Sequence, residues 1–169
     1  MKVVVQVINA FTDNGTGGNP AGVVFQAERF SQSQKQLIAA NAGFSETAFV
    51  SPSQTADFKL EFFTPTRQIP HCGHATIATF GYLRQTGQIT RDTSSKETID
   101  GDRRILLRDG LAFMEQQAPQ YEAINTHEVL ASLGITYEQL LHQHGPIIVN
   151  TGNRFAVVPV QDEAAVASV

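Results

Sequence analysis

The stretch "IPHCGHATIATFGYLR", residues 69–84, decides how the fold is interpreted. Its last ten residues are apolar apart from two threonines and a final arginine, so a helix over Ala75–Arg84 would be apolar on every side. A helix of that kind must be enclosed by other elements. The segments before and after it have strand composition. We therefore expect an α+β fold in which a sheet surrounds one buried helix.

The segments before residue 69 predict several strands and one helix. Val3–Phe11 is nearly continuous in apolar residues, which predicts a strand covered on both faces and central in its sheet. Ser31 and Gln34 form a capping box for a helix that Gly43 can end. "SETAFVSP" predicts the next strand. In "DFKLEFF", residues 57–63, apolar and charged residues alternate, which predicts a strand with one solvent-facing side.

After the apolar helix, strands are predicted at "ETID", residues 97–100, at "RRILLRD" and at "GLAFMEQQ". Asp109 and Gly110 suit a tight hairpin between the last two. Beyond Pro119, a helix capped by Asn125 and a hairpin turning near residues 151–154 follow, which is too little to bury a core alone. We therefore expect a first domain over residues 1–118 and the beginning of a second, incomplete domain over 119–169.

Composition and charge exclude several classes of protein. The 169 residues carry 12 basic and 16 acidic side chains, for a net charge of -4, and no continuous basic face that nucleic-acid binding would need. The single cysteine agrees with a reducing compartment, and no stretch approaches the length of a membrane span. The loop "NGTGGNP" has Pro20 where a dinucleotide fingerprint needs glycine. We expect a cytoplasmic protein without nucleic-acid or membrane partners.

Gly73 and His74 stand where the apolar helix begins. The unpaired N–H groups and the positive dipole end of a first turn attract a small carboxylate. His74 could donate a hydrogen bond to the same anion or move a proton, because an ordinary imidazole titrates near neutrality. The alternative is a histidine that only satisfies a helix end or a strand carbonyl.

Cys72 precedes the same helix end, where the dipole would favour the thiolate and make it a nucleophile or a proton carrier. Cysteine is also a common small core residue, and this alternative stays open. A metal site built from His71, Cys72 and His74 is disfavoured because its spacing is cramped. We expect neither a metal nor a cofactor.

Glu46 is the most informative carboxylate. In a strand it projects to the same side as Ala48 and Val50, whereas Glu61 shares its side with Lys59. Burial would raise the pKa of Glu46 toward neutrality and suit it to general acid and base work. An exposed glutamate at the mouth of a strand is the alternative, and periodicity does not separate the two.

Four motifs together resemble the PhzF-like (phenazine biosynthesis-like) family of isomerases and epimerases: "NAFT…GNPAGVVF", "GFSETAFV", "FFTPT" and "CGHATIATFGYL". The resemblance is close over residues 1–118 and weaker afterwards. It implies a diaminopimelate-epimerase-like fold, in which an antiparallel, barrel-like sheet wraps around a central helix in each of two domains. It further implies an active site between the domains and cofactor-independent proton transfer at carbon.

By position, the resemblance makes Glu46 the acid/base residue and His74 the histidine of the helix start, with Cys72 as a possible second proton carrier. Gly73, Asn19 and Ala75 are the expected substrate-binding residues. The substrate is expected to be a small carboxylate. Gln68 and His71 depart from the family's more usual acidic and apolar residues, which concerns specificity.

These observations lead to one principal hypothesis and two alternatives. The chain is an isomerase or epimerase of this family, or its N-terminal portion, and acts as a homodimer or associates through its incomplete second unit. The first alternative is a non-catalytic small-molecule binding or assembly module that keeps half of the fold. The second is a thiol-dependent enzyme that uses Cys72.

Overall fold

The computed structural model describes residues 2–169 and divides the chain into two compact units, Met1–Glu115 and Gln116–Val169. In the first unit the elements are β1 (Gln6–Ala10), β2 (Asn19–Val24), η1 (Ala27–Arg29), α1 (Gln32–Ala42), β3 (Thr47–Ser51), β4 (Phe58–Phe63), β5 (Gln68–Ile69), α2 (Gly73–Gln85), β6 (Thr93–Glu97), β7 (Arg103–Arg108) and β8 (Leu111–Met114).

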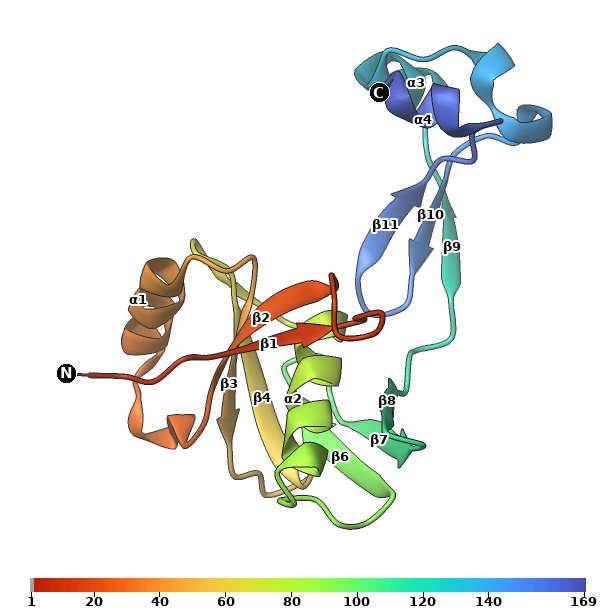
Figure 1. The fold of residues 1–169 in the computed structure, drawn as a ribbon. Helices are drawn as coiled ribbons and strands as arrows, with labels where there is room; N and C mark the ends of the chain where they lie inside the picture. Colours follow the sequence, from red (N-terminus) through yellow and green to blue (C-terminus); the bar gives the residue numbers. More distant parts are fainter. Residues whose placement is uncertain (1) are drawn as a thin grey trace. The chain divides into compact units, whose positions relative to one another are not determined.

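The eight strands of the first unit form one sheet around α2. Its order is β1-β2-β3-β4-β6-β7-β8, with β5 paired to β4. Most neighbours are antiparallel, but β2 runs parallel to β3 and β4 runs parallel to β6. α2 contacts strands from both ends of this order, namely β1 and β2 as well as β7 and β8. The sheet therefore curls around the helix. In Figure 1 the two ends of the sheet are the red strands β1 and β2 and the green-to-teal strands β7 and β8.

α2 is the core of the first unit. Six residues between Ala75 and Leu83 are buried, among them Phe80 and Leu83 with no exposed surface. The four apolar ones, Ala75, Ala78, Phe80 and Leu83, pack with the inward residues of the strands in one hydrophobic cluster. The predicted buried helix is thus confirmed, although Ile77 and Gly81 remain partly exposed and enclosure on every side was too strong an expectation.

The opposite face of the sheet is covered by α1. Ser31 and Gln34 form the predicted capping box, and Gly43 ends the helix with a left-handed backbone at φ 72°. Apolar residues under α1 form a second cluster around Phe49 and Phe63, whose rings meet edge to face. The first helix was predicted correctly from its caps, which are local signals.

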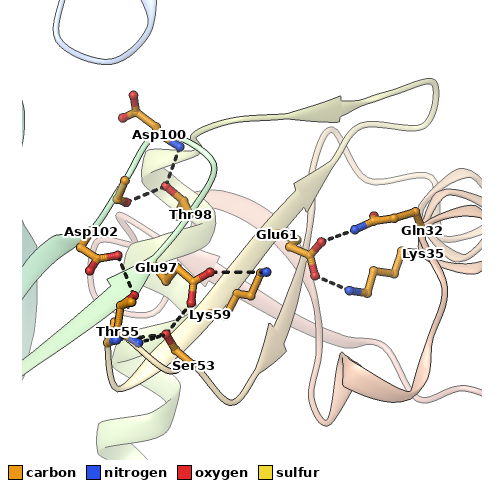
Figure 2. Close-up of polar contacts among 12 residues, drawn as sticks. Gln32, Lys35, Ser53, Thr55, Lys59, Glu61, Glu97, Thr98, Asp100 and Asp102 are labelled. Carbon is orange, nitrogen blue, oxygen red and sulfur yellow. Dashed lines mark hydrogen bonds and ion pairs between the residues drawn. The ribbon is translucent and has the colours of Figure 1, made fainter.

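The charged side of β4 is covered at Glu61 but not at Lys59, whose side chain is 41% exposed, so the predicted solvent-facing side holds only in part. Glu61 is only 6% exposed because α1 lies over it. Lys35 and Gln32 of α1 both donate hydrogen bonds to its carboxylate (Figure 2). Burial raises the pKa of Glu61, but the bonds from Lys35 and Gln32 outweigh burial, and the pKa is lowered. At Glu61 the charged position therefore marks a buried ion pair with Lys35, whereas at Lys59 it faces solvent in part.

Two further strand predictions were wrong. β1 is the edge of the sheet rather than a central strand, and its outward Val7 is 60% exposed while Ala10 is buried. The apolar side chains of β1 are therefore packed against other elements on only one face of the strand. The strand expected at residues 97–100 lies earlier, at Thr93–Glu97, because residues 98–101 form a turn closed by Thr98 and Gly101. The hairpin at Asp109 and Gly110 is confirmed, with φ of 52° and 77°.

The second unit contains β9 (Gln120–Ala123), α3 (Thr126–Leu133), η2 (Tyr137–Gln139), η3 (Leu141–Gln143), β10 (Ile147–Asn150), β11 (Arg154–Val157) and α4 (Glu163–Ala167). The cap of α3 by Asn125 and the hairpin β10–β11 agree with the prediction, whereas β9, which completes a three-stranded sheet, and α4 were not foreseen. A small cluster of Leu130, Ile135 and Leu140 is its only core among the described residues.

The sheet of the second unit has little cover. Every residue of β9 and β11 is exposed, including Tyr121 at 65% and Phe155 at 60%. Sheets of a folded domain normally bury at least one apolar face. That residues 119–169 are the beginning of a larger domain stays a prediction, and this exposed sheet is the feature that supports it.

No helix among residues 2–169 has the length and apolar character needed to cross a bilayer.

Candidate active site

The N-terminus of α2 carries three of the predicted site residues. Cys72 is its N-cap, with extended backbone at φ -147° and ψ 120°, and Gly73 and His74 form the start of its first turn. The N-cap side chain makes no hydrogen bond of capping geometry, although the nearby N–H groups of Ala75 and His74 act on its thiol. The helix end retains a capacity to bind an anion.

Glu46 reaches this helix end from the sheet. It lies directly before β3, and its backbone carbonyl accepts a hydrogen bond from Gly22 N at 3.1 Å. A Cβ atom on Gly22 would lie 2.9 Å from Thr47 Oγ1 and 3.0 Å from the ring of Phe44. Glycine is therefore required here for β2 to approach the start of β3, and this approach positions Glu46.

The three side chains form a row with His74 in the middle. Glu46 Oε2 lies 3.4 Å from His74 Nε2, and His74 Nδ1 lies 3.5 Å from Cys72 Sγ. The side chains of Glu46 and His74 are 23% and 12% exposed, so both are shielded without being sealed off. No hydrogen bond joins Glu46 to His74 although the two atoms are close, and within residues 2–169 the buried Nε2 atom makes no hydrogen bond. It can therefore donate to a ligand.

Cys72 is not a thiolate at neutral pH. Burial raises the pKa of its thiol to about 11, and the negative charge of Glu46 acts in the same direction. The N–H groups of Ala75 and His74 and the charge of Lys96 lower the pKa without reversing the effect of burial. We expected the helix dipole to favour the thiolate, but burial of the Cys72 side chain outweighs the dipole. A neutral thiol can still donate a proton to a partner.

The remaining predicted residues differ in their placement. Ala75 is fully buried, so only its backbone faces the helix end, beside Gly73. Asn19 begins β2, opposite Ala10 of β1, and its side chain is exposed. No hydrogen bond or ion pair among residues 2–169 joins Asn19 to Glu46, Cys72 or His74. Its role in binding stays a prediction.

A metal ion could in principle use Glu46, Cys72 and His74, whose potential ligand atoms lie within 4.8 Å of one another. However, the imidazole presents Nε2 to Glu46 and Nδ1 to Cys72. One ion can use only one nitrogen of a ring, so these three side chains would have to rearrange around it. As they lie, the three side chains do not form a coordination sphere for one ion.

Two polar residues are buried behind the helix end, and sequence reasoning considered only His71 of the two. Lys96 of β6 is fully buried, and its Nζ donates a hydrogen bond to Thr76 Oγ1 of α2 at 2.8 Å. His71 is only 4% exposed. A strand with inward Ser94 and Lys96 carries no apolar alternation, so nothing in the sequence pattern indicated that these side chains face the core.

Comparison with known proteins places this arrangement in a family. The family model described as "Phenazine biosynthesis-like protein" matches residues 8–169. The chain belongs to this family. A curated relative, "Uncharacterized isomerase YfhB" of Bacillus subtilis, is 37% identical over 160 residues, which is 90% of this chain and 54% of the relative.

Solved structures agree with this family and also support the fold. The crystal structure of the Bacillus anthracis phenazine biosynthesis protein of the PhzF family has a TM-score of 0.85 and 33% identity over 98% of this chain and 58% of that one. A predicted epimerase from Pseudomonas aeruginosa has a TM-score of 0.82 at 17% identity, over 99% of this chain and 62% of that one, which supports the fold alone. The first unit therefore has the diaminopimelate-epimerase-like fold that the motifs implied.

Coverage is unequal in these comparisons. The chain spans about half the length of the curated relatives it matches, 54% of one and 58% of another. The relatives are named isomerases, and the activity of this chain is therefore a matter for proposal.

Proposed function

We propose that this chain carries the proton-transfer half of a PhzF-like isomerase or epimerase that acts on a small carboxylate without a cofactor. The row Glu46–His74–Cys72 at the N-terminus of α2 carries this proposal. A base, a hydrogen-bond donor and a helix end that attracts anions are the groups that proton removal next to a carboxylate needs.

In the proposed reaction the Glu46 carboxylate takes a proton from a carbon of the substrate. The electron pair of the broken C–H bond moves into the adjacent carbonyl system and creates an oxyanion. His74 Nε2 and the first-turn N–H groups of α2, beginning at Gly73, hold that charge. Glu46 then returns the proton, to the same carbon or to another carbon of the system, and the neutral thiol of Cys72 is a second donor from the other end of the row.

The names of the relatives support the reaction type, because the curated proteins that match are isomerases by name. The chain spans only 54% and 58% of these relatives, and their greater length supports the proposal that a second domain completes the site. We also propose that two chains associate, because the site needs a further part to be complete. The proposal includes a cytoplasmic location, which rests on composition.

Deuterium exchange tests the role of Glu46. Candidate carboxylates are incubated with the protein in deuterated water, and uptake of label at carbon is followed by NMR. We expect Glu46→Gln to lower the exchange rate about 10²- to 10⁴-fold, the range of a general base. Glu97→Gln, on the outer side of the sheet, is the matched control and should exchange at the unmodified rate. Equal uptake by Glu46→Gln and the unmodified chain would remove Glu46 from the mechanism.

A non-catalytic binding or assembly module is the second candidate. The exposed Tyr121 and Phe155 of the second unit favour it, because apolar surface of this kind promotes association. Sedimentation at several concentrations, combined with the exchange assay, separates the two candidates. Association without any label uptake by the assembled chain would favour the module over the enzyme.

A further inference from the structure

Lys96 is the most unusual charged residue of the first unit. Its side chain has a relative exposure of 0% and projects from β6 into the core beside α2. The ammonium donates a hydrogen bond to Thr76 Oγ1 at 2.8 Å and lies 5.2 Å from the ring centre of Phe62. One hydroxyl and one aromatic face replace only part of the hydration that a buried ammonium loses. Stability alone therefore does not explain a lysine at this position.

Thr76 links Lys96 to the start of α2. Its hydroxyl donates a hydrogen bond to the carbonyl of Cys72 at 2.6 Å, so the same oxygen accepts the bond from Lys96. Cys72 is the N-cap residue, directly before Gly73 and His74. A chain of two hydrogen bonds thus runs from β6 to the segment that carries the candidate site.

The charged groups that face Lys96 leave a net positive charge behind this segment. Asp100 forms an ion pair of 2.6 Å with Arg103, which satisfies the charges of both. His71 contributes no charge at neutral pH, because burial and the charge of Lys96 lower its pKa to about 4. Cys72 is also neutral, since its pKa is raised to about 11. The one carboxylate that acts on Lys96, Asp100, is thus already paired with Arg103, and these groups together keep a net positive charge.

Lys96 can lose this charge near neutral pH. Burial lowers its pKa to about 8, and the charge of Arg103 acts in the same direction. The charge of Asp100 opposes them, and so would Cys72 in its thiolate form. The ammonium is present at pH 7 and is largely gone at pH 9. Any interaction that depends on its charge must follow the same pH range.

We propose that Lys96 is a positioning residue of the candidate site, whose enclosed ammonium holds the Cys72–Gly73–His74 segment through Thr76 and adds its charge to the N-terminus of α2. The site then prefers an anionic ligand while Lys96 is protonated. This proposal rests on the proposed function for the location of the ligand, but it concerns binding rather than proton transfer at carbon.

Benzoate, a small planar carboxylate, is a suitable probe. Its affinity for the 169-residue chain is measured by NMR between pH 7 and 9, together with the titration of the lysine side-chain ¹³Cε signals. We expect the affinity to fall about tenfold as pH rises through the pKa of Lys96. Because coupling between two binding events is reciprocal, saturating benzoate should raise the pKa of Lys96 by about one unit.

Variants separate the charge from the hydrogen-bonded link. Lys96→Met should bind benzoate about tenfold more weakly at pH 7 and with no pH dependence up to pH 9. Thr76→Val keeps the ammonium but breaks the link, and should show a smaller loss that retains the pH dependence. Lys59→Met removes a half-exposed lysine from the neighbouring strand and should bind as the unmodified chain does. Circular dichroism checks that each variant is folded.

Several results would overturn the proposal. Equal benzoate affinity in folded Lys96→Met and the unmodified chain would exclude a role in anion binding, as would a Lys96 titration that benzoate leaves unchanged. Failure of the unmodified chain to bind benzoate at pH 7 would exclude the anion preference itself. By contrast, pH-dependent binding without any deuterium exchange would refute the proposed function and leave the role of Lys96 standing.

Discussion

Two buried lysines lie on opposite faces of the same sheet and differ in what they meet. Lys35, 5% exposed, reaches from α1 to the carboxylate of Glu61, which is 6% exposed (Figure 2). Lys96, with no exposure, meets a hydroxyl of α2 and the face of Phe62. A charge that is neutralised where it lies serves the packing of a helix. The ammonium of Lys96 has no carboxylate of its own, so its charge acts on the neighbouring groups, which are those of the candidate site.

The largest expected effect comes from leaving Lys35 without its partner. Glu61→Leu would keep an ammonium under α1 without a carboxylate, and removing one member of a buried pair costs about 3 to 5 kcal/mol. We expect this loss in the free energy of unfolding, measured with urea at pH 7. Adding Lys35→Met to Glu61→Leu should recover most of it, because two apolar side chains of similar volume replace such a pair well.

A partly exposed pair on the same side of the sheet provides the control. Lys59 Nζ lies 3.4 Å from Glu97 Oε1, and the two side chains are 41% and 28% exposed (Figure 2). Glu97→Gln should change the free energy of unfolding by less than about 1 kcal/mol, as solvent-exposed pairs do. A loss for Glu61→Leu no larger than that for Glu97→Gln would contradict the structural role of the Lys35–Glu61 pair.

Replacing the other buried lysine should have the opposite sign. Lys96→Met removes the cost of burying a charge and should raise the free energy of unfolding by about 1 to 3 kcal/mol at pH 7. The pKa of Lys96 is about 8 in the folded chain and 10.5 ordinarily, so between these values the unfolded chain binds the extra proton. The unmodified chain therefore gains stability as pH rises from 8 to 10.5.

The difference between Lys96→Met and the unmodified chain should accordingly be largest below pH 8 and shrink toward pH 10.5. Urea unfolding at pH 7, 8, 9 and 10 measures it. Destabilisation by Lys96→Met at every pH would mean that Lys96 holds the fold together as Lys35 does, and the contrast between the two lysines would disappear.

The two lysines also show which kinds of feature can be predicted from the sequence. The capping box at Ser31, the hairpin at Asp109 and the apolar run after Gly73 are local signals, and each predicted its element correctly. The covered face of β4 and the edge position of β1 depend on which distant element packs where. No local period contains that information, so the position of β1 was predicted wrongly and the burial of Glu61 was not foreseen.

The candidate site divides in the same way. The family motifs singled out Glu46, Cys72 and His74, and the structure brings them within 4.8 Å of one another. Lys96 escaped notice because the sequence "TSSKE" around it is polar and typical of a surface. Only the curling of the sheet, which turns β6 toward α2, makes this polar strand part of the interior.

The smallest expected effect tests whether the two basic groups behind α2 sense each other. Burial first, and then the charge of Lys96, lower the pKa of His71 from the ordinary 6.5 to about 4. As pH falls below 6.5, His71 becomes protonated in the unfolded chain but stays neutral in the folded chain. The free energy of unfolding therefore falls until about pH 4. The loss attributable to His71 should be about 1 kcal/mol between pH 6 and 5, and His71→Gln should lack it. In Lys96→Met the same loss should be smaller, because one of the charges that keeps His71 neutral is gone. Urea unfolding of the three chains at pH 5 and 6 measures these slopes, and an identical slope in Lys96→Met would show that the ammonium does not act on its neighbours.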